Sequence, residues 1–299
     1  MLTIGSRGSA LALWQARWIA GRLESLGQAT RIEIIHTTGD RVLDVTLAKV
    51  GTKGMFTKEI EEALLSGAID LAVHSLKDMP TELPPGLTLA AIPAREDPRD
   101  ALVGRKLQEL TSGQRVGSSS LRRAAQLRAA RPDLVIEDIR GNVDTRLRKL
   151  DEKQYDAIVL AAAGLNRLGW SDRIAEILPA EVMCPAVGQG ALAVEVRVDG
   201  RVPEGLMASL DDAPTRAAVT AERALLGALG GGCQVPVGAF AEVSNGLVSL
   251  RSVVISPDGS KVVRHAASGG NAEELGRQAG EYLLAHGGRE ILDAVYKTP

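Results

Sequence analysis

The stretch Ile69-Asp70-Leu71-Ala72-Val73-His74-Ser75-Leu76-Lys77-Asp78-Met79-Pro80 gives the clearest indication of the fold. Residues 69–74 are predicted to form a buried strand, because strands covered on both faces are apolar along most of their length. A polar segment follows at once and brings Lys77 and Asp78 to the carboxyl end of that strand. Short apolar strands alternate with amphipathic helices on both sides of this stretch, and this alternation predicts an open α/β sheet.

The residues before this strand continue the pattern. Strands are predicted at 2–4 and 31–36, and helices at 10–26, with Ser9 as the N-cap, and at 58–65. The first helix is expected to bury one face. Its members are Leu11, Trp14, Trp18, Leu23 and Leu26.

A second alternating unit follows Pro93–Pro98, a segment without periodicity that predicts a crossing between lobes. Strands are expected near 115–117, 134–138 and 157–160, and helices near 121–131, 143–151 and 162–168. After residues 185–190 the apolar run 191–196 is expected to return to the first sheet. The sequence thus predicts two α/β lobes, formed by residues 1–94 with 191–209 and by residues 98–186, with a cleft between them.

The last third has a different pattern, which predicts a small α+β domain over residues 213–299. A helix at 214–229 precedes three strands at 239–243, 247–256 and 261–267, separated by the turn signals Asn245-Gly246 and Asp258-Gly259. Helices are expected at 272–285 and 289–296. The three strands should form an antiparallel sheet.

Composition excludes several classes of protein. A length of 299 residues fits two or three domains, and no apolar run is long enough to span a bilayer. The amino terminus lacks the pattern of an export signal, so a cytoplasmic protein without a membrane partner is expected. The net charge of −2 argues against nucleic-acid binding. Two cysteines and four histidines offer no disulfide framework and no metal-ligand spacing. A monomer is expected.

Two strand-to-helix junctions predict anion binding. The first, Gly117-Ser118-Ser119-Ser120-Leu121-Arg122-Arg123, combines a helix start, hydroxyls and two arginines. Alone, it also fits an ordinary Ser N-cap with solvated arginines. The second, Arg140-Gly141-Asn142-Val143-Asp144-Thr145-Arg146, repeats the chemistry, and Arg167 follows the next strand. Ligands of open α/β sheets bind at the carboxyl ends of strands, so several carboxylates are expected there.

The first lobe offers a smaller set of candidates. Arg7 and Ser9 occupy a similar junction, and Lys49 and Lys53 lie in a long glycine-containing loop, where a lysine is ordinarily just solvated. Asp78 has two interpretations. It is either a turn-forming acid before a proline or a catalytic carboxylate kept ionised by cationic neighbours.

The two cysteines lie in different settings. Cys233 belongs to Gly230-Gly231-Gly232-Cys233-Gln234-Val235-Pro236, where three glycines leave the thiol on an open loop, so it is interpreted as an attachment point. Cys184 precedes Pro185 in an apolar context and is interpreted as a small core residue.

Together these segments resemble the porphobilinogen deaminase family, and the resemblance covers nearly the whole chain. The segments that carry it are Ser9–Ala16, Lys49–Gly54, Ala72–Pro80, Arg95–Asp100, Arg140–Val143, Pro185–Gly190 and Gly231–Pro236. The family has Thr where this chain has Ser118, and more often an apolar residue at Cys184.

The resemblance implies a fold, an activity and a cofactor. The fold is two lobes like those of periplasmic binding proteins plus a third domain. The activity is that of a transferase of tetrapyrrole biosynthesis that joins four porphobilinogen molecules head to tail with loss of ammonia and releases a linear tetrapyrrole by hydrolysis. The cofactor is a dipyrromethane bound through a thioether to Cys233.

The resemblance also implies roles for individual residues. Asp78 is the catalytic carboxylate, which lies at the reacting pyrrole nitrogens. The groups that hold cofactor and substrate carboxylates are Arg7, Ser9, Ser75, Lys77, Ser118, Ser119, Ser120, Arg122, Arg123, Arg140, Gly141, Asn142, Arg146, Arg167 and Gln189. Gln15, Lys49, Lys53 and Phe56 are further active-site residues, with Phe56 stacking on a pyrrole and residues 37–56 closing over the site. No metal is implied.

Two other interpretations remain open on the residues alone. The two lobes suit a solute-binding or ligand-sensing protein, since a fold does not fix a function. A cysteine hydrolase would pair Cys233 with one of His36, His74, His265 or His286. A covalent adduct of two linked pyrroles is expected only for the deaminase.

Overall fold

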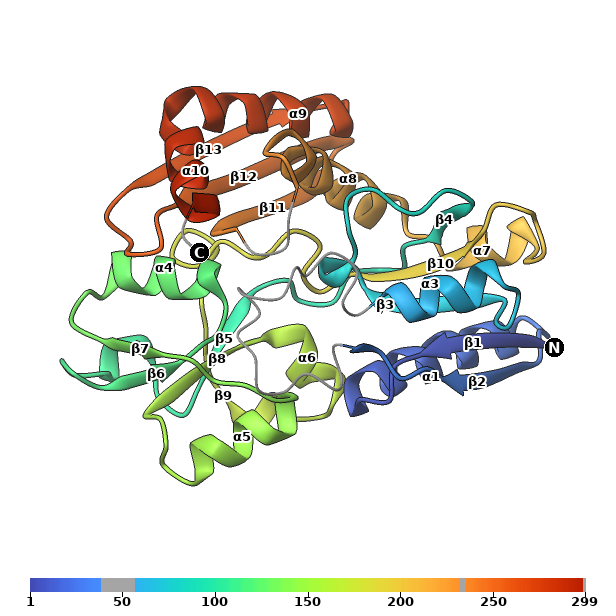
Figure 1. Cartoon of the computed structure of the whole chain (residues 1–299), viewed down its shortest axis with the longest axis horizontal. Helices are drawn as coiled ribbons and strands as arrows, with labels where there is room; N and C mark the ends of the chain where they lie inside the picture. Colours follow the sequence, from blue (N-terminus) through green and yellow to red (C-terminus); the bar gives the residue numbers. More distant parts are fainter. Residues whose placement is uncertain (39–56, 232–234, 298–299) are drawn as a thin grey trace.

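A computed structural model describes residues 1–38, 57–231 and 235–297, which form three β-sheets (Figure 1). The first sheet has the order β2 (Thr30–Ile34), β1 (Leu2–Ser6), β3 (Leu71–Ser75), β10 (Leu192–Arg197), β4 (Leu87–Ala91). β1 is parallel to β2 and β3, whereas β10 runs antiparallel to β3 and β4. The predicted return of the apolar run to this sheet is confirmed, and every residue of β10 is buried.

The second sheet repeats this plan with the order β7 (Val135–Glu137), β6 (Arg115–Gly117), β8 (Ala157–Ala161), β5 (Asp100–Val103), β9 (Ile174–Ile177). β6 is parallel to β7 and β8, and β5 is antiparallel to both of its neighbours. In each sheet the parallel strands end at the same edge, so their carboxyl-terminal junctions lie close together.

The third sheet is antiparallel and consists of β11 (Val237–Ser244), β12 (Leu247–Ile255) and β13 (Val262–Gly269). The helices α8 (Ala213–Ala228), α9 (Ala272–Leu283) and α10 (Arg289–Lys297) pack on it around one buried apolar cluster. The predicted fold class, two α/β lobes and a small α+β domain with a three-stranded antiparallel sheet, is confirmed. None of the described helices is both long and apolar enough to cross a bilayer.

Within the described residues, six helices cover the two larger sheets: α1 (Ala10–Ser25), α3 (Lys58–Leu65), α4 (Leu121–Ala130), α5 (Val143–Asp151), α6 (Ala162–Arg167) and α7 (Glu204–Leu210). All but α7 were predicted from periodicity. The prediction also missed β4, β5 and β9, which have four or five residues each.

The predicted buried face of α1 is wrong in part. Leu23 is fully buried, but Leu26 is exposed and Leu11, Trp14 and Trp18 are only half-buried. The residues that face the sheet are instead Gln15, Ala16, Ile19, Ala20 and Leu23. Ala16 and Ala20 on this face let α1 approach the strands closely, whereas Trp14 and Trp18 remain partly exposed.

The two chain crossings between the lobes lie against each other. Glu96 N–H donates to Gly190 O at 3.2 Å. Gly190 has a φ of +85°, and a Cβ added there would lie 2.4 Å from Glu96 O, so this approach requires glycine.

Glu222 on α8 connects these crossings to the third sheet. Its fully buried carboxylate accepts from Arg95 Nη1 at 2.7 Å, from Gly188 N–H at 2.7 Å and from Ala241 N–H at 2.8 Å. Arg95 belongs to the first crossing, Gly188 to the second and Ala241 to β11. One carboxylate therefore bonds to three segments that are far apart in the chain.

Glu222→Gln is expected to lower the free energy of unfolding by about 3–5 kcal/mol, because it leaves the buried Arg95 guanidinium without its counter-charge. The amide also turns a donor toward N–H groups that need an acceptor. Urea unfolding measures the change. Glu181→Gln is the matched control, because Glu181 and Arg251 form an exposed ion pair whose loss is expected to cost less than about 1 kcal/mol. Equal losses in the two variants would contradict the assignment.

Candidate functional site

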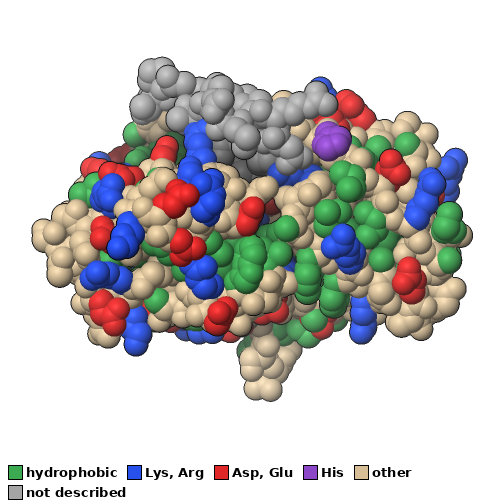
Figure 2. Space-filling view, turned by 90° about the horizontal axis from the view of Figure 1, so that it is seen from below, with side chains coloured by type: hydrophobic (Ala, Val, Ile, Leu, Met, Phe, Trp, Pro, Cys, Tyr) green, Lys and Arg blue, Asp and Glu red, His purple; other side chains and the backbone are tan. Residues whose placement is uncertain are grey.

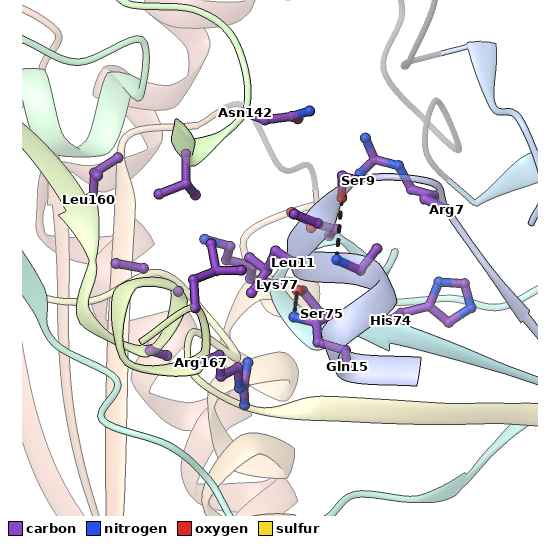
Figure 3. Close-up of a pocket in the computed structure, with 18 of the residues that line it drawn as sticks. Arg7, Ser9, Leu11, Gln15, His74, Ser75, Lys77, Asn142, Leu160 and Arg167 are labelled. Atoms are coloured by element: carbon purple, nitrogen blue, oxygen red, sulfur yellow. Dashed lines mark hydrogen bonds between the residues drawn. The ribbon is translucent and has the colours of Figure 1, made fainter. Parts of the chain in front are cut away.

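A cavity of about 650 Å³ lies between the two larger sheets, where their strand-to-helix junctions face each other. One wall comes from the ends of β1 and β3 and from the first turns of α1, and the other from the end of β8 and from α5 and α6. Figure 3 shows Arg7 and Ser9 on one side of this space and Asn142 and Leu160 on the other. The cavity lies in the predicted cleft between the two lobes, and junctions of both lobes line it.

The first wall is built around the amino terminus of α1. Ser9 caps the helix by accepting from Ala12 N–H at 3.3 Å, which holds the chain from Arg7 onward along the cavity. One turn further, Gln15 Nε2 donates to Ser75 Oγ at 2.9 Å, as Figure 3 shows. This hydrogen bond ties α1 to the end of β3 directly before the segment that holds Lys77 and Asp78.

Lys77 and Asp78 lie in a single turn of 3₁₀ helix, residues Leu76–Asp78, that follows β3. Leu76 is buried and anchors the turn, whereas the Asp78 side chain is exposed on the cavity surface. Burial lowers the pKa of Lys77 to about 8, with Arg123 adding to the shift and Asp78 opposing it. Lys77 is therefore a cation whose charge is lost just above neutral pH.

The second wall is built around the amino terminus of α5. Gly141 has a φ of +108° and turns the chain so that Arg140, Asn142 and Arg146 line the cavity. Arg146 Nε donates to Gly141 O at 2.7 Å. Burial, with repulsion from Arg123, lowers the pKa of Arg146 to about 10, so it stays charged at neutral pH.

Arg167, at the end of α6, completes this wall. Its Nη2 donates to Gly190 O at 2.6 Å, and its guanidinium carbon lies 5.9 Å from the centre of the Trp14 ring. Burial lowers the pKa of Arg167 to about 10, partly offset by Glu96. The half-buried Trp14 of α1 thus contacts Arg167 of α6 across the cleft.

The fully buried Asp100 at the start of β5 holds the paired arginines in place. Arg122 Nη1 donates to one of its oxygens at 2.6 Å, Arg123 Nε to the other at 2.9 Å, and Gln189 Nε2 to that second oxygen at 3.0 Å. Burial alone would raise the pKa of Asp100, but the two guanidinium groups outweigh it and hold the pKa well below its usual range. A second bond of Arg122 goes to Cys184 O at 2.6 Å.

This arrangement places part of the predicted anion site away from the cavity surface. Ser118, Ser120, Arg122 and Gln189 were expected to hold carboxylates, but none of them lines the cavity. The physical reason for Arg122 and Gln189 is that the buried Asp100 needs their donors. Ser120 caps α4 by accepting from Arg123 N–H at 3.4 Å. Ser118 Oγ accepts from Ser120 N–H at 3.3 Å.

The remaining predicted residues divide into two sets. Those that the structure brings together around the cavity are Arg7, Ser9, Gln15, Ser75, Lys77, Asp78, Ser119, Arg123, Arg140, Gly141, Asn142, Arg146 and Arg167. Those that lie outside the described residues are Lys49, Lys53, Phe56 and Cys233.

Sequence reasoning missed Asp100 as a site residue. It was quoted within Arg95–Asp100, but the strand that it begins was not recognised. The available signal was the adjacent pair Arg122-Arg123, since two neighbouring buried guanidinium groups require a buried carboxylate. Cys184 was interpreted correctly: it is buried, and burial raises the pKa of its thiol to about 12.

The cavity is strongly cationic. Among the described residues, six cationic side chains line it, Arg7, Lys77, Arg123, Arg140, Arg146 and Arg167, against the carboxylates Asp78 and Asp144. Figure 2 shows acidic and basic side chains interspersed over one outer face, so that face does not share the excess. Within the described chain, Lys77, Arg146 and Arg167 form no ion pair with a carboxylate. Such a cavity can bind a ligand with several carboxylates.

Two of the histidines lie far from this cavity. His265 and His286 stack on Tyr282 with ring centroids 4.0 and 3.8 Å apart, beside the third sheet. His74 borders the cavity, but its Nε2 lies 3.1 Å from the buried Glu195 Oε2. His36 also borders it.

Solved structures similar to this chain include a periplasmic substrate-binding protein of an ABC transporter from Coxiella burnetii and the methionine-binding protein MetQ. The first is 15% identical with a TM-score of 0.43 and covers 70% of this chain and 92% of its own. The second is 13% identical with a TM-score of 0.43 and covers 70% and 89%.

Sequence comparison gives much closer matches. The family model "Porphobilinogen deaminase, dipyromethane cofactor binding domain" matches residues 2–202, and "Porphobilinogen deaminase, C-terminal domain" matches residues 216–285. The porphobilinogen deaminase of Desulforamulus reducens is 52% identical over 98% of this chain and 97% of its own length. That of Syntrophotalea carbinolica is 54% identical over 100% and 97%. With two family models and near full-length relatives in agreement, the chain belongs to the porphobilinogen deaminase family.

Proposed function

We propose that this enzyme is a transferase that condenses four porphobilinogen molecules head to tail, with loss of one ammonia at each step, and then releases the linear tetrapyrrole hydroxymethylbilane by hydrolysis. The observation that carries the proposal is the cationic cavity between the two larger sheets. Each porphobilinogen brings an acetate and a propionate, and the cavity offers more cationic groups than its own carboxylates can neutralise.

The cavity also suits the dipyrromethane cofactor of the family. Two linked pyrroles carry four carboxylates, and the cations at hand are arginines on both walls together with Lys77. When bound, the cofactor supplies the pyrrole carbon to which the first substrate is joined. Cys233 is the proposed attachment residue. Arg123, held rigid by Asp100, and Arg146 are proposed to bind carboxylates on the second wall.

Asp78 is the proposed catalytic residue, because its carboxylate is exposed to the cavity among cationic side chains. Positive charge develops on the substrate pyrrole as ammonia leaves, and a fixed carboxylate stabilises that charge. The same carboxylate can accept a hydrogen bond from the pyrrole N–H, and Lys77 beside it binds a substrate carboxylate. Both groups lie in the single 3₁₀ turn that follows β3.

The function is tested by intact-mass measurement of the purified protein, followed by addition of porphobilinogen. The expected result is a covalent adduct of two pyrroles at rest, further increments of one pyrrole after substrate is added, and release of ammonia. A solute-binding protein or a cysteine hydrolase would show the unmodified polypeptide mass and no increments. That result would overturn the proposal.

The pH dependence of substrate binding is expected to follow Lys77. Its pKa of about 8 means that the ammonium is charged below pH 8 and neutral above it, so the KM for porphobilinogen should rise about tenfold between pH 7 and pH 9. Lys77→Arg keeps a charge throughout this range and should flatten the profile. If the rise in KM were the same in Lys77→Arg, another group would be responsible.

The remaining properties are proposed on the same basis. The domain boundaries follow the sequence prediction: residues 1–94 with 191–209, 98–186 and 213–299. The enzyme is proposed to be a cytoplasmic monomer that acts on porphobilinogen and has no nucleic-acid or membrane partner.

A further inference from the structure

The turn that carries Asp78 packs against α8, a helix of the third domain. Val219 of α8 packs in one buried cluster with Leu76 and Met79, the residues that flank Lys77 and Asp78. One helical turn later, Arg223 Nη2 donates to Pro80 O at 2.7 Å and to Thr81 O at 3.0 Å. Figure 1 shows α8 between the third sheet and the loop that joins β3 to β4. The chain on the C-terminal side of Asp78 is thus bonded directly to α8.

The same helix leads into the segment that contains Cys233. After α8 ends at Ala228, Gly231 N–H donates to Leu226 O at 2.9 Å, and Tyr296 from α10 donates its hydroxyl to Gly231 O at 3.1 Å. Gly231 also lies against the Asp78 loop: a Cβ added there would be 3.3 Å from Thr81 Oγ1. Thr81 therefore contacts both Arg223 of α8 and Gly231, the residue from which the chain continues to Cys233. The segment from Gly231 to Pro236 is called the attachment segment below.

We propose that Arg223 is a positioning residue that fixes the Asp78 turn to the helix from which the attachment segment departs. The inference rests on the proposed function. A guanidinium group that reaches two consecutive carbonyl oxygens restrains a loop more firmly than a single contact can. The reaction requires Asp78 to meet pyrroles tethered through Cys233, and a misplacement of about 1 Å in such a site costs roughly 100-fold in rate. Arg223 itself does not line the cavity.

The test compares Arg223→Met and Arg223→Lys in the holo-protein with Arg216→Met. Arg216 lies on the same helix and also donates to a carbonyl of the first lobe, Ala90 O at 3.2 Å. The same guanidinium group forms an ion pair with Asp211. Hydrogen exchange of the amides of residues 76–84 is measured first, on resting protein. Steady-state kinetics and intact mass follow.

Arg223→Met is expected to raise amide exchange in residues 76–84 at least tenfold and to lower kcat at least tenfold, with the KM changed less than about twofold and the adduct retained. Arg223→Lys keeps the charge but replaces the planar guanidinium by a shorter, single ammonium nitrogen, so it should recover part of both effects. Arg216→Met should show neither. The proposal is overturned by unchanged exchange and kcat in Arg223→Met, by equal effects in Arg216→Met, or by a change confined to KM.

Failure of this inference and failure of the proposed function give different results. If the wild-type protein bore no adduct and did not consume porphobilinogen, the function would fail, whereas the exchange measurement on resting protein would still report whether Arg223 restrains the turn. If Arg223→Met did not fold, Arg223→Lys would decide: a partial loss of amide protection and of kcat would support the proposal, and exchange and kcat equal to those of the wild type would overturn it.

Discussion

Cys233→Ser is expected to yield a protein without the dipyrromethane and almost without activity. A serine hydroxyl is a far poorer nucleophile than a thiolate, so the dipyrromethane is not attached. Without that primer, chain growth has no starting point. The variant should also have a lower Tm than the wild type, because a ligand bound only to the native state stabilises that state. The six cationic side chains that line the cavity would repel one another without the cofactor carboxylates, which adds to the loss.

Intact mass spectrometry decides this prediction, and Cys184→Ala is the matched control. The Cys184 thiol is buried, its pKa is raised to about 12, and it packs between Gln126 and β12, so it offers no thiolate at neutral pH. Cys184→Ala should therefore retain the adduct and most of the activity. An intact adduct in Cys233→Ser would show that the cofactor is attached elsewhere.

Asp78→Asn is expected to lower the turnover rate at least ~100-fold, by analogy with the removal of one preorganised contact to a transition state. A carboxylate about 4 Å from a developing cation contributes on the order of 4 kcal/mol at an effective dielectric constant near 20. Asparagine keeps the shape and removes the charge. Because the Asp78 side chain is exposed on the cavity surface, the substitution removes no buried contact, and the protein should fold and carry its cofactor.

Single-turnover kinetics on the holo-protein separate this effect from binding. Asp78→Asn should slow ammonia loss and coupling while the KM changes little, since the arginines that bind the carboxylates remain. Asp78→Glu keeps the charge on a longer arm and should retain more activity than Asn. Asp144→Asn removes a charge from the opposite wall and should have a much smaller effect. A near-normal coupling rate in Asp78→Asn would leave Asp78 as a turn residue.

The sequence pattern located several elements with the bounds that the structure gives them. The helices over 58–65 and 143–151 and the strand over 115–117 were predicted with the bounds that the structure gives them. It failed for α1, where Leu26 is exposed and Gln15 is buried. Gln15 is buried because its amide bonds to Ser75 on a strand sixty residues away, a contact that local sequence does not contain.

The sequence by itself determined the class of the fold, the junctions that form the cavity, and the chemistry expected there. Each depends on local features: alternation of strands and helices, glycine and serine at helix starts, and arginines next to them. Only the tertiary structure decided which arginine faces the cavity. Arg122 and Arg123 are neighbours in the chain, yet Arg122 is bound to Asp100 and Cys184 O while Arg123 also reaches the cavity. That division depends on where β5 places the buried carboxylate of Asp100. A buried guanidinium group needs a counter-charge that is close in space, and that group can be far away in the sequence.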